Sequence, residues 1–332
     1  MKKFRLSVLM FALSGIFVLS SCTKENILEE GEPDNLAIES RSNTIVDIAL
    51  SNPDFSILVD AVVRAGLVDA LSGPGPFTVF APTNTAFQAF LSANGFNNVN
   101  EVPVPLLTTI LTTHVLSGEF FAANISTGYF NTLATSPAPY NRPTDIFIQK
   151  TSGVTINGSI NVVVADVDAS NGVVHVVDKV IAPSDVLTLA LSNPNFSILV
   201  QALTRPDLST DFVSVLSGNG PFTILAPTNA AFQALLNSNP AWNTLNDIPA
   251  ATLEAVLKYH VAAGVNYTAD YLYRRPRVNT LLSGSSYTTT LAFGGGGLSI
   301  RVLAASNQAN VIAADVQGQN GVIHAIDTVI LP

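Results

Sequence analysis

The chain reads GPFTVFAPTNTAFQAFL over residues 75–91 and repeats this pattern as GPFTILAPTNAAFQALL over residues 220–236, with 13 of 17 positions identical. Two further pairs of segments occur in the same order, namely 49–59 with 190–200 (10 of 11 identical) and 171–183 with 320–332 (8 of 13). The copies are 141, 145 and 149 residues apart, whereas solenoid units repeat every ~20–50 residues. The sequence therefore predicts a tandem duplication of one domain.

The repeated stretch itself predicts a strand, a corner and a helix. Phe77-Thr-Val-Phe80 is typical of a short β-strand that follows a Gly-Pro turn. Pro82 predicts the end of the strand, because proline has no N–H to donate to a sheet. Thr83 or Asn84 can cap the next helix by accepting a hydrogen bond from its first free N–H groups. Three apolar residues then share one helix face at i, i+3, i+4 spacing: Phe87, Phe90 and Leu91. We interpret the stretch as a folding nucleus.

Residues 1–21 have the pattern of an export signal. Three basic residues precede a 14-residue uncharged run, Leu6–Leu19, which is shorter than a membrane-spanning helix of ~20 residues. The run ends in Leu19-Ser-Ser-Cys22, which resembles the bacterial lipobox and implies lipid attachment to Cys22 after cleavage before it. Cys22 is the only cysteine of the chain, so an intramolecular disulfide is excluded. An uncleaved signal anchor with a chance cysteine is the alternative.

The segment 22–43 is rich in acidic residues and predicts a flexible tether between a lipid anchor and the first domain. Without the signal the chain has 12 basic and 24 acidic residues, a net charge of −12. Such a protein repels nucleic acids, so we expect no nucleic-acid partner. Thr23 follows the cysteine, where an aspartate would have resembled an inner-membrane retention signal. We expect an outer membrane lipoprotein that is surface-exposed, with a periplasm-facing position as the alternative.

The repeats predict domains at 44–183 and 184–332 with almost no linker between them, which favours a stiff or docked pair. Within the first domain, helical periodicity dominates up to about residue 115 and strand-like runs follow. The Asn-Gly pairs at 157–158 and 171–172 are typical of type I′ hairpin turns, in which both residues have positive φ.

These motifs resemble the signatures of the fasciclin-domain family, the β-ig-h3-like adhesion modules. Thr78–Asn84 and Thr223–Asn229 are similar to the first signature, and Asn171–Asp178 and Asn320–Asp327 are similar to the second. The resemblance implies an α+β protein of two tandem fasciclin-like domains, each a wedge-shaped β-sandwich with packed α-helices. It also implies a role in adhesion or extracellular recognition.

The resemblance implies tentative partner-binding positions as well. In animal members, partner contacts have been linked to an Asp-Ile pair near the second signature and to a Tyr-His pair. The matching positions here are Asp166-Val167, Asp315-Val316 and Tyr259-His260, and Thr113-His114 replaces the Tyr-His pair in the first domain. The changes of isoleucine to valine and of tyrosine to threonine argue against integrin-style binding. We expect an extracellular protein or glycan ligand.

A second candidate patch lies at residues 267–277, which hold three tyrosines and three arginines in an otherwise acidic protein. Exposed aromatic rings beside polar groups are typical of sugar sites, so Tyr271, Arg274 and Arg275 are tentative contact residues. On this hypothesis the protein is an accessory glycan- or ligand-binding lipoprotein of an outer-membrane uptake system. A solvated loop with no ligand is the other interpretation of the patch, and a spacer that displays something else is a third function.

The sequence does not favour an enzyme. Four histidines occupy two pairs of equivalent positions, His114 with His260 and His175 with His324. None has a second histidine or a cysteine at metal-ligand spacing, and each lies in an apolar run. Buried imidazoles that fix local structure are therefore favoured over an acid–base or metal role. No Gly-x-Ser-x-Gly elbow is present. We expect no catalytic residue, no metal and no cofactor.

Overall fold

The computed structural model describes residues 43–274, 277–294 and 297–332. The predicted signal, Cys22 and nearly all of the predicted tether lie outside these residues, as does Arg275. Residues 41–332 belong to one compact unit. Among the residues so described, no single helix is long and apolar enough to cross a membrane. One pair of helical segments in this described part, Val186–Ser192 and Pro194–Leu203, together reaches the required length and composition, with a bend of 99° between them.

The first domain begins with helices and continues with strands, as its periodicity predicts. Its helical elements are α1 (Ile45–Ser51), η1 (Pro53–Phe55), α2 (Ser56–Arg64), α3 (Val68–Leu71), α4 (Asn84–Ala93), η2 (Val99–Glu101) and α5 (Val104–Thr113). Its strands are β1 (Phe77–Pro82), β2 (Val115–Ser117), β3 (Gly128–Thr135), β4 (Pro143–Lys150), β5 (Val154–Ile156), β6 (Ile160–Ala169) and β7 (Gly172–Val177).

The second domain follows the same plan. Its helical elements are α6 (Val186–Ser192), η3 (Pro194–Phe196), α7 (Ser197–Leu203), α8 (Phe212–Leu216), α9 (Asn229–Asn237), η4 (Leu245–Asp247), α10 (Ala250–Tyr259) and α11 (Ala269–Leu272). Its strands are β8 (Phe222–Pro227), β9 (Val261–Ala263), β10 (Arg277–Asn279), β11 (Ser286–Gly294), β12 (Gly297–Leu303), β13 (Gln308–Gly318) and β14 (Gly321–Ile326). Each domain therefore mixes helices with one sheet, which confirms the α+β class.

The order of the strands is the same in the two domains, and the first sheet is closed into a barrel. In the first, strands β3-β4-β5-β6-β7-β1-β2 are neighbours in this order, and the pair Leu116↔Thr132 joins β2 to β3 and closes the sheet. In the second, the order β10-β11-β12-β13-β14-β8-β9 is the same. A parallel pair in each sheet joins the two repeated motifs, β1 with β7 and β8 with β14. The motifs, far apart in sequence, are therefore neighbouring strands in space.

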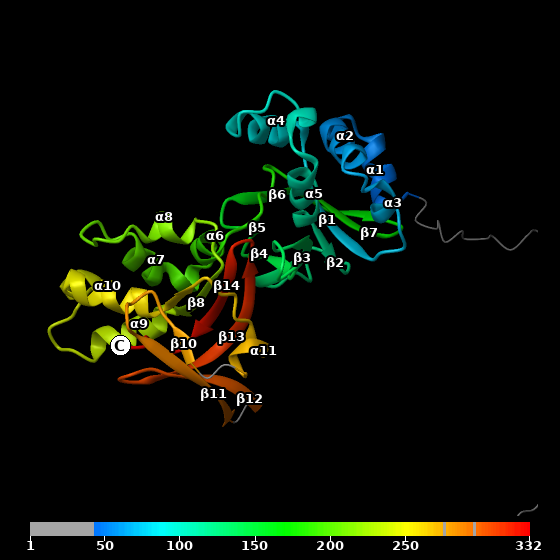
Figure 1. The fold of residues 1–332 in the computed structure, drawn as a ribbon. Coiled ribbons are helices and arrows are strands. Elements are labelled where there is room, and N and C mark those ends of the chain that lie inside the picture. Colours follow the sequence, from blue (N-terminus) through cyan, green and yellow to red (C-terminus); the bar gives the residue numbers. More distant parts are fainter. Residues whose placement is uncertain (1–42, 275–276, 295–296) are drawn as a thin grey trace, which may run out of the picture. The chain divides into compact units, whose positions relative to one another are not determined.

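Helices α1, α2 and α3 lie beside β1 and β7 (Figure 1). The core of the first domain has two parts. One packs the helices against β1 and β7, and the other fills the space between strands, with Phe80, Ile146 and Ile148 at its centre. The second domain has the same two parts, with Leu225 and Tyr259 in the inner one. A helix layer and a strand-enclosed core are therefore both duplicated.

The predicted strand, corner and helix are confirmed at residues 77–93. Thr83 is the N-cap of α4, and its hydroxyl oxygen accepts a hydrogen bond from the Ala86 N–H at 3.3 Å. Asn84 does not cap the helix, because its side chain accepts from the Ile57 N–H and donates to the Pro53 carbonyl, each at 2.9 Å. These bonds attach α4 to the start of α2. The corresponding Asn229 makes the same bonds in the second domain.

One turn prediction is confirmed and one is wrong. Asn157 and Gly158 both have positive φ, 47° and 71°, as a type I′ turn requires. In the second pair only Gly172 does, with φ 153°, and it already belongs to β7. The Asn171 side chain is instead bound to three backbone groups, which are described below. A Cβ atom on Gly172 would lie 2.0 Å from the Phe77 carbonyl oxygen, so the close approach of β1 requires glycine here.

Asn171 and Asn320 connect the start of each domain to the end of its β-hairpin. The Asn171 side chain accepts from the Ile45 N–H at 2.9 Å and donates to the carbonyls of Leu71 and Gly73, both at 2.8 Å. Asn320 makes the equivalent three bonds in the second domain. Both side chains are buried. The second signature is therefore needed to hold α1 and the end of α3 against the sheet.

Candidate recognition sites

Asp166 and Asp315 lie at equivalent irregular points of β6 and β13. Register shifts occur around each aspartate, between Val162 and Val167 in β6 and between Val311 and Val316 in β13. The two aspartates have φ of 62° and 61°, a left-handed conformation that is uncommon outside glycine. Both strands therefore bulge at the same place, and the bulge turns the aspartate toward the surface.

Each aspartate is held in place by the neighbouring histidine and by a loop. The Asp166 N–H donates to Nδ1 of His175 at 3.2 Å, and Nε2 of His175 lies 2.8 Å from the Phe120 carbonyl oxygen. Since Nδ1 accepts, Nε2 carries the proton and the imidazole is neutral. Burial lowers the pKa of His175, which agrees with this form. The Asp166 carboxylate in turn accepts from the Ala122 N–H at 2.6 Å.

The second domain repeats this arrangement atom for atom. The Asp315 N–H donates to Nδ1 of His324 at 3.2 Å, and Nε2 of His324 lies 2.7 Å from the Tyr267 carbonyl oxygen. The Asp315 carboxylate accepts from the Ala269 N–H at 2.7 Å. The carboxylates remain partly exposed, at 40% for Asp166 and 44% for Asp315, while the histidines are fully buried. His175 and His324 thus position two surface aspartates.

An exposed apolar run precedes each of these aspartates. We call residues 163–166 and 312–315 the bulge segments; most of their side chains are exposed. Val163 and Val164 are 56% and 51% exposed, and Ile312 is 57% exposed. Alanines fill the remaining positions before the aspartate. Each domain therefore presents aliphatic side chains beside a fixed carboxylate, a combination that suits contact with another molecule.

Tyr259 and His260, in contrast, are buried. Tyr259 has no exposed surface, and its hydroxyl donates to the Ser286 carbonyl at 2.9 Å and accepts from the Ala305 N–H at 3.1 Å. The two nitrogens of His260 bind the Val256 carbonyl and the Ile330 N–H. Burial lowers the pKa of His260 to about 4. These residues cannot touch a partner in this structure, so any part they have in binding is indirect, through the packing of α10 on the sheet.

His114 repeats the bonds of His260 in the first domain. Its nitrogens bind the Ile110 carbonyl and the Ile181 N–H, and burial lowers its pKa to about 4. Thr113, in place of a tyrosine, keeps its hydroxyl on the Thr109 carbonyl within α5. All four histidines are therefore bound to backbone groups. Among the described residues, no group of three or more His, Cys, Asp or Glu side chains could hold a metal ion.

The tyrosine-rich patch lies at α11 and just after it. Tyr271 and Tyr273 are each 44% exposed, and Arg274 is exposed beside them. The rings of Tyr267 and Tyr271 have centroids 6.5 Å apart with a 36° tilt, so they do not form one flat platform. Tyr271, Tyr273 and Arg274 are therefore exposed together in this segment.

Comparison with known proteins agrees with this architecture. The fasciclin domain model matches residues 53–183 and 194–332. Protein sll1483 of Synechocystis is 44% identical over 140 residues, which cover 42% of this chain and 73% of that protein. Transforming growth factor-beta-induced protein ig-h3 of Sus scrofa is 28% identical over 268 residues, 79% of this chain but only 35% of that protein. Two α+β repeats with matching motifs define a tandem two-domain protein, and the chain belongs to the fasciclin-domain family.

A solved structure, the FAS1 domain pair from the insect cell adhesion molecule fasciclin I, is also similar. It aligns with a TM-score of 0.49 at 19% identity, over 85% of this chain and 98% of that one. Fasciclin domains are associated with adhesion and extracellular recognition in relatives of this chain.

Proposed function

We propose that this protein is an envelope-anchored adhesion or recognition protein that contacts its partner through the two bulge segments. The observation that carries the proposal is their exposed apolar surface: Val163, Val164 and Ile312 are each more than half exposed, shortly before Asp166 and Asp315. Exposed aliphatic side chains that adjoin one another are a cost to a free protein in water and gain stability when a partner covers them.

The chemistry of the segments suits a protein surface better than a sugar. The aliphatic side chains supply apolar area. The aspartate supplies one carboxylate, which a hydrogen bond from a loop N–H already holds in position. Preorganised groups lose little conformational entropy on binding. A partner with an apolar patch next to a basic residue or a free N–H would complement each segment.

Anchoring through lipid on Cys22 completes this proposal. The uncharged run of residues 6–19, its basic flank and the Leu19–Cys22 motif support it. Protease digestion of intact cells, followed by immunoblotting with a periplasmic protein as the protected control, tests the position. Loss of the immunoblot band for this protein supports a position on the cell surface. A band that survives digestion would indicate a periplasm-facing protein and contradict surface adhesion.

The glycan-binding alternative rests on Tyr271, Tyr273 and Arg274, which are exposed together. It predicts that the double substitution Tyr271→Ala and Tyr273→Ala lowers retention on polysaccharide columns. Unchanged retention removes this loop from the glycan hypothesis. The bulge segments do not enter this test, so the two functions are separable.

The main proposal is tested by retention of cells that display the full chain on surfaces coated with extracellular proteins. The triple substitution Val163→Ser, Val164→Ser and Ile312→Ser should lower retention at least tenfold. The matched control replaces Leu106 and Val213, which are 41% and 40% exposed on helices, by serine. Equal losses for both variants would mean that general surface polarity, and not the bulge segments, controls retention.

A further inference from the structure

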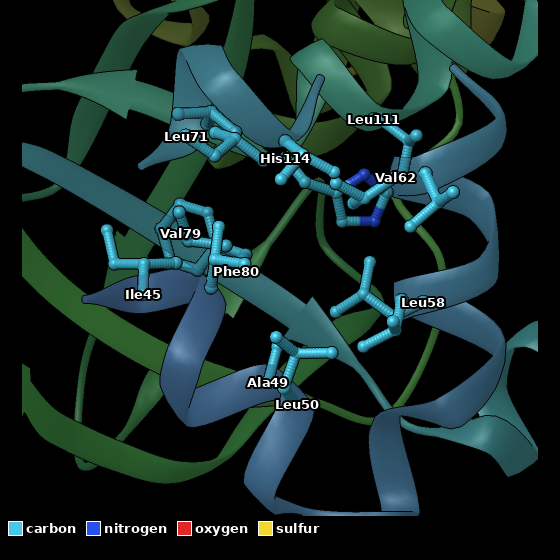
Figure 2. A pocket seen from close by; sticks show the side chains of 15 residues that line it. Ile45, Ala49, Leu50, Leu58, Val62, Leu71, Val79, Phe80, Leu111 and His114 are labelled. Atoms are coloured by element: carbon cyan, nitrogen blue, oxygen red, sulfur yellow. The ribbon is translucent and has the colours of Figure 1, made fainter. Parts of the chain in front are cut away.

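An apolar cavity lies between the helices and the sheet of the first domain, away from the bulge segments. Figure 2 shows its lining side chains, which come from α1, α2 and α3, from β1 and from the end of α5. Its volume is about 100 Å³. Ile45, Leu58, Val79, Phe80 and Leu111 are among the lining residues.

The cavity offers no free polar group to a ligand or to water. Its one polar lining residue is His114, and both of its ring nitrogens are already bound to backbone groups, at 2.8 Å and 2.9 Å. Apolar cavities of similar size stay dry and bind small hydrocarbons, as an engineered cavity of ~150 Å³ does with benzene. Only an apolar group is therefore suited to this space.

The cavity reaches the surface through an apolar rim. Leu50 on α1 and Val63 on α2 line it and are 62% and 61% exposed. A continuous aliphatic path therefore leads from Val79 on the sheet to solvent. This shape suits an elongated tail whose other end stays outside, rather than a compact molecule that is fully enclosed.

The second domain contains the same site in a closed form. Its equivalent space has a volume of only about 20 Å³ and is lined by the corresponding residues of α6, α7, α8, α10 and β8. Leu203 and Ile224 stand where the first domain has Val62 and Val79, and each adds one methylene group. The fold therefore does not require the cavity.

A short insertion also distinguishes the helix layer of the second domain. Eight residues separate α7 from α8, whereas three separate α2 from α3. The residue that begins α8 is Phe212, which is fully buried, while the equivalent Leu67 is only half-buried. An aromatic ring is thus packed into the helix layer of the second domain where the first domain has a smaller, partly exposed side chain.

The charges of the surrounding helices determine which charge the headgroup of a ligand can carry. The helical segments α1, η1, α2 and α3 carry four exposed or partly exposed aspartates, at positions 47, 54, 60 and 69. Their only basic residue is Arg64, whose guanidinium donates to the Val102 carbonyl at 2.8 Å. An anionic headgroup such as a carboxylate or phosphate would be repelled at the rim.

We propose that the first domain binds an uncharged amphiphile, whose alkyl tail enters the cavity between α1, α2 and β1 and whose headgroup remains at the Leu50–Val63 rim. A neutral lipid acyl chain or a long-chain alcohol has this chemistry. The site is independent of the bulge segments, so it adds a ligand to the proposed recognition function and does not depend on it.

The test is a titration of the purified full-length protein with 1-octanol, followed by methyl NMR of its Leu, Val and Ile side chains. The proposal predicts shifts at Leu58, Val62 and Val79 and none at Leu199, Leu203 and Ile224. Octanoate at neutral pH should bind at least tenfold more weakly. Equal shifts in both domains, or equal affinity for octanoate, would overturn the proposal.

A sharper test places the side chains of the second domain at the equivalent positions of the first domain. Val62→Leu combined with Val79→Ile should lower octanol affinity at least tenfold without lowering the thermal unfolding midpoint. The matched control, Leu203→Val with Ile224→Val, exchanges the same methylene groups in the other domain and should leave octanol affinity of the first domain unchanged. Unchanged affinity in the Val62→Leu, Val79→Ile variant would overturn the site, and the unfolding midpoint shows that this variant is folded.

Discussion

The backbone N–H of Gln317, in the second domain, donates to Oδ2 of Asp145, in the first domain, at 2.7 Å in a buried position. Asn131 donates to the other carboxylate oxygen, also at 2.7 Å. Nearby, the Tyr129 hydroxyl donates to the Leu189 carbonyl at 3.0 Å. The two repeats therefore share hydrogen bonds and are not independent of each other, which agrees with the near absence of a linker in the sequence.

This contact predicts a pH dependence. Burial raises the pKa of Asp145 to about 7, although its hydrogen bonds with Gln317 and Asn131 oppose the change. Between pH 3.8 and about pH 7, the folded protein keeps a proton on Asp145 that the unfolded chain has released. The contribution of Asp145 to the free energy of unfolding is therefore present at low pH. It is lost as the pH rises through this range, by ~1.4 kcal/mol for each pH unit. Denaturant unfolding of the wild type and of Asp145→Asn at pH 5 and pH 8 measures it.

The expected result is a wild-type stability, relative to Asp145→Asn, that is higher at pH 5 than at pH 8. Comparison with the variant is needed because other groups titrate in the same range. Asp178→Asn, which alters a half-buried carboxylate that accepts hydrogen bonds from Asn161, serves as the control. A relative stability of the wild type that rises with pH would contradict the assignment.

The buried histidines predict the opposite slope. Burial lowers the pKa of His114 and of His260 to about 4, from 6.5. Between these values the unfolded chain binds protons that the folded protein does not, so stability is present above the unfolded pKa and is lost as the pH falls. His260→Gln should weaken the loss of unfolding free energy between pH 6.5 and pH 4.5. An unchanged slope in this variant would contradict a lowered pKa of His260 in the folded protein.

The Asn171 side chain predicts a large stability effect. Asn171→Ala removes three buried hydrogen bonds and leaves the Ile45 N–H without its acceptor. We expect a loss of ~2–4 kcal/mol in the free energy of unfolding, since each unsatisfied buried group costs ~1–3 kcal/mol. Asn100→Ala, at an exposed position of η2, is the control and should cost under ~0.5 kcal/mol. Similar losses for both variants would be inconsistent with an anchoring role for Asn171.

Two substitutions of Asp166 distinguish the effect of its charge from the effect of its backbone conformation. Asn tolerates positive φ and its side-chain oxygen can still accept from the Ala122 N–H, so Asp166→Asn should preserve stability within ~0.5 kcal/mol. Asp166→Ala loses the bond and is strained at φ 62°, so it should be destabilised by ~1–2 kcal/mol. Thermal unfolding checks both. If partner retention falls in Asp166→Asn while its stability is preserved, the charge itself contacts the partner.

Much of the fold could be predicted from the sequence because its signals are local and occur twice. The strand at Phe77, the proline corner and the Thr83 cap depend on a few consecutive residues. The same pattern recurs at Thr223–Asn229, which indicates that it is not a chance arrangement of residues. The family resemblance supplied the class of fold. The Asn157-Gly158 turn was predicted correctly for the same reason, since its conformation is a property of the two residues themselves.

The features that could not be predicted depend on contacts between distant residues. The Asn171-Gly172 pair has the composition of a tight turn, but its conformation is determined by Ile45, Leu71 and Phe77. The burial of Tyr259 and His260 likewise depends on the strands that cover them, whereas the family resemblance had implied that they are contact residues. The exposed Val163 and Val164 were missed, because an apolar β-branched run usually predicts a buried strand.

The most direct test of the central claim is site-specific photo-crosslinking on intact cells that display the full chain. A photoreactive amino acid replaces Val163 or Ile312 in the bulge segments, and Leu106 or Val213 at helix positions of lower exposure. The account predicts crosslinks to an extracellular partner from positions 163 and 312 and none from 106 and 213. Crosslinks to the partner from the helix positions alone would contradict it.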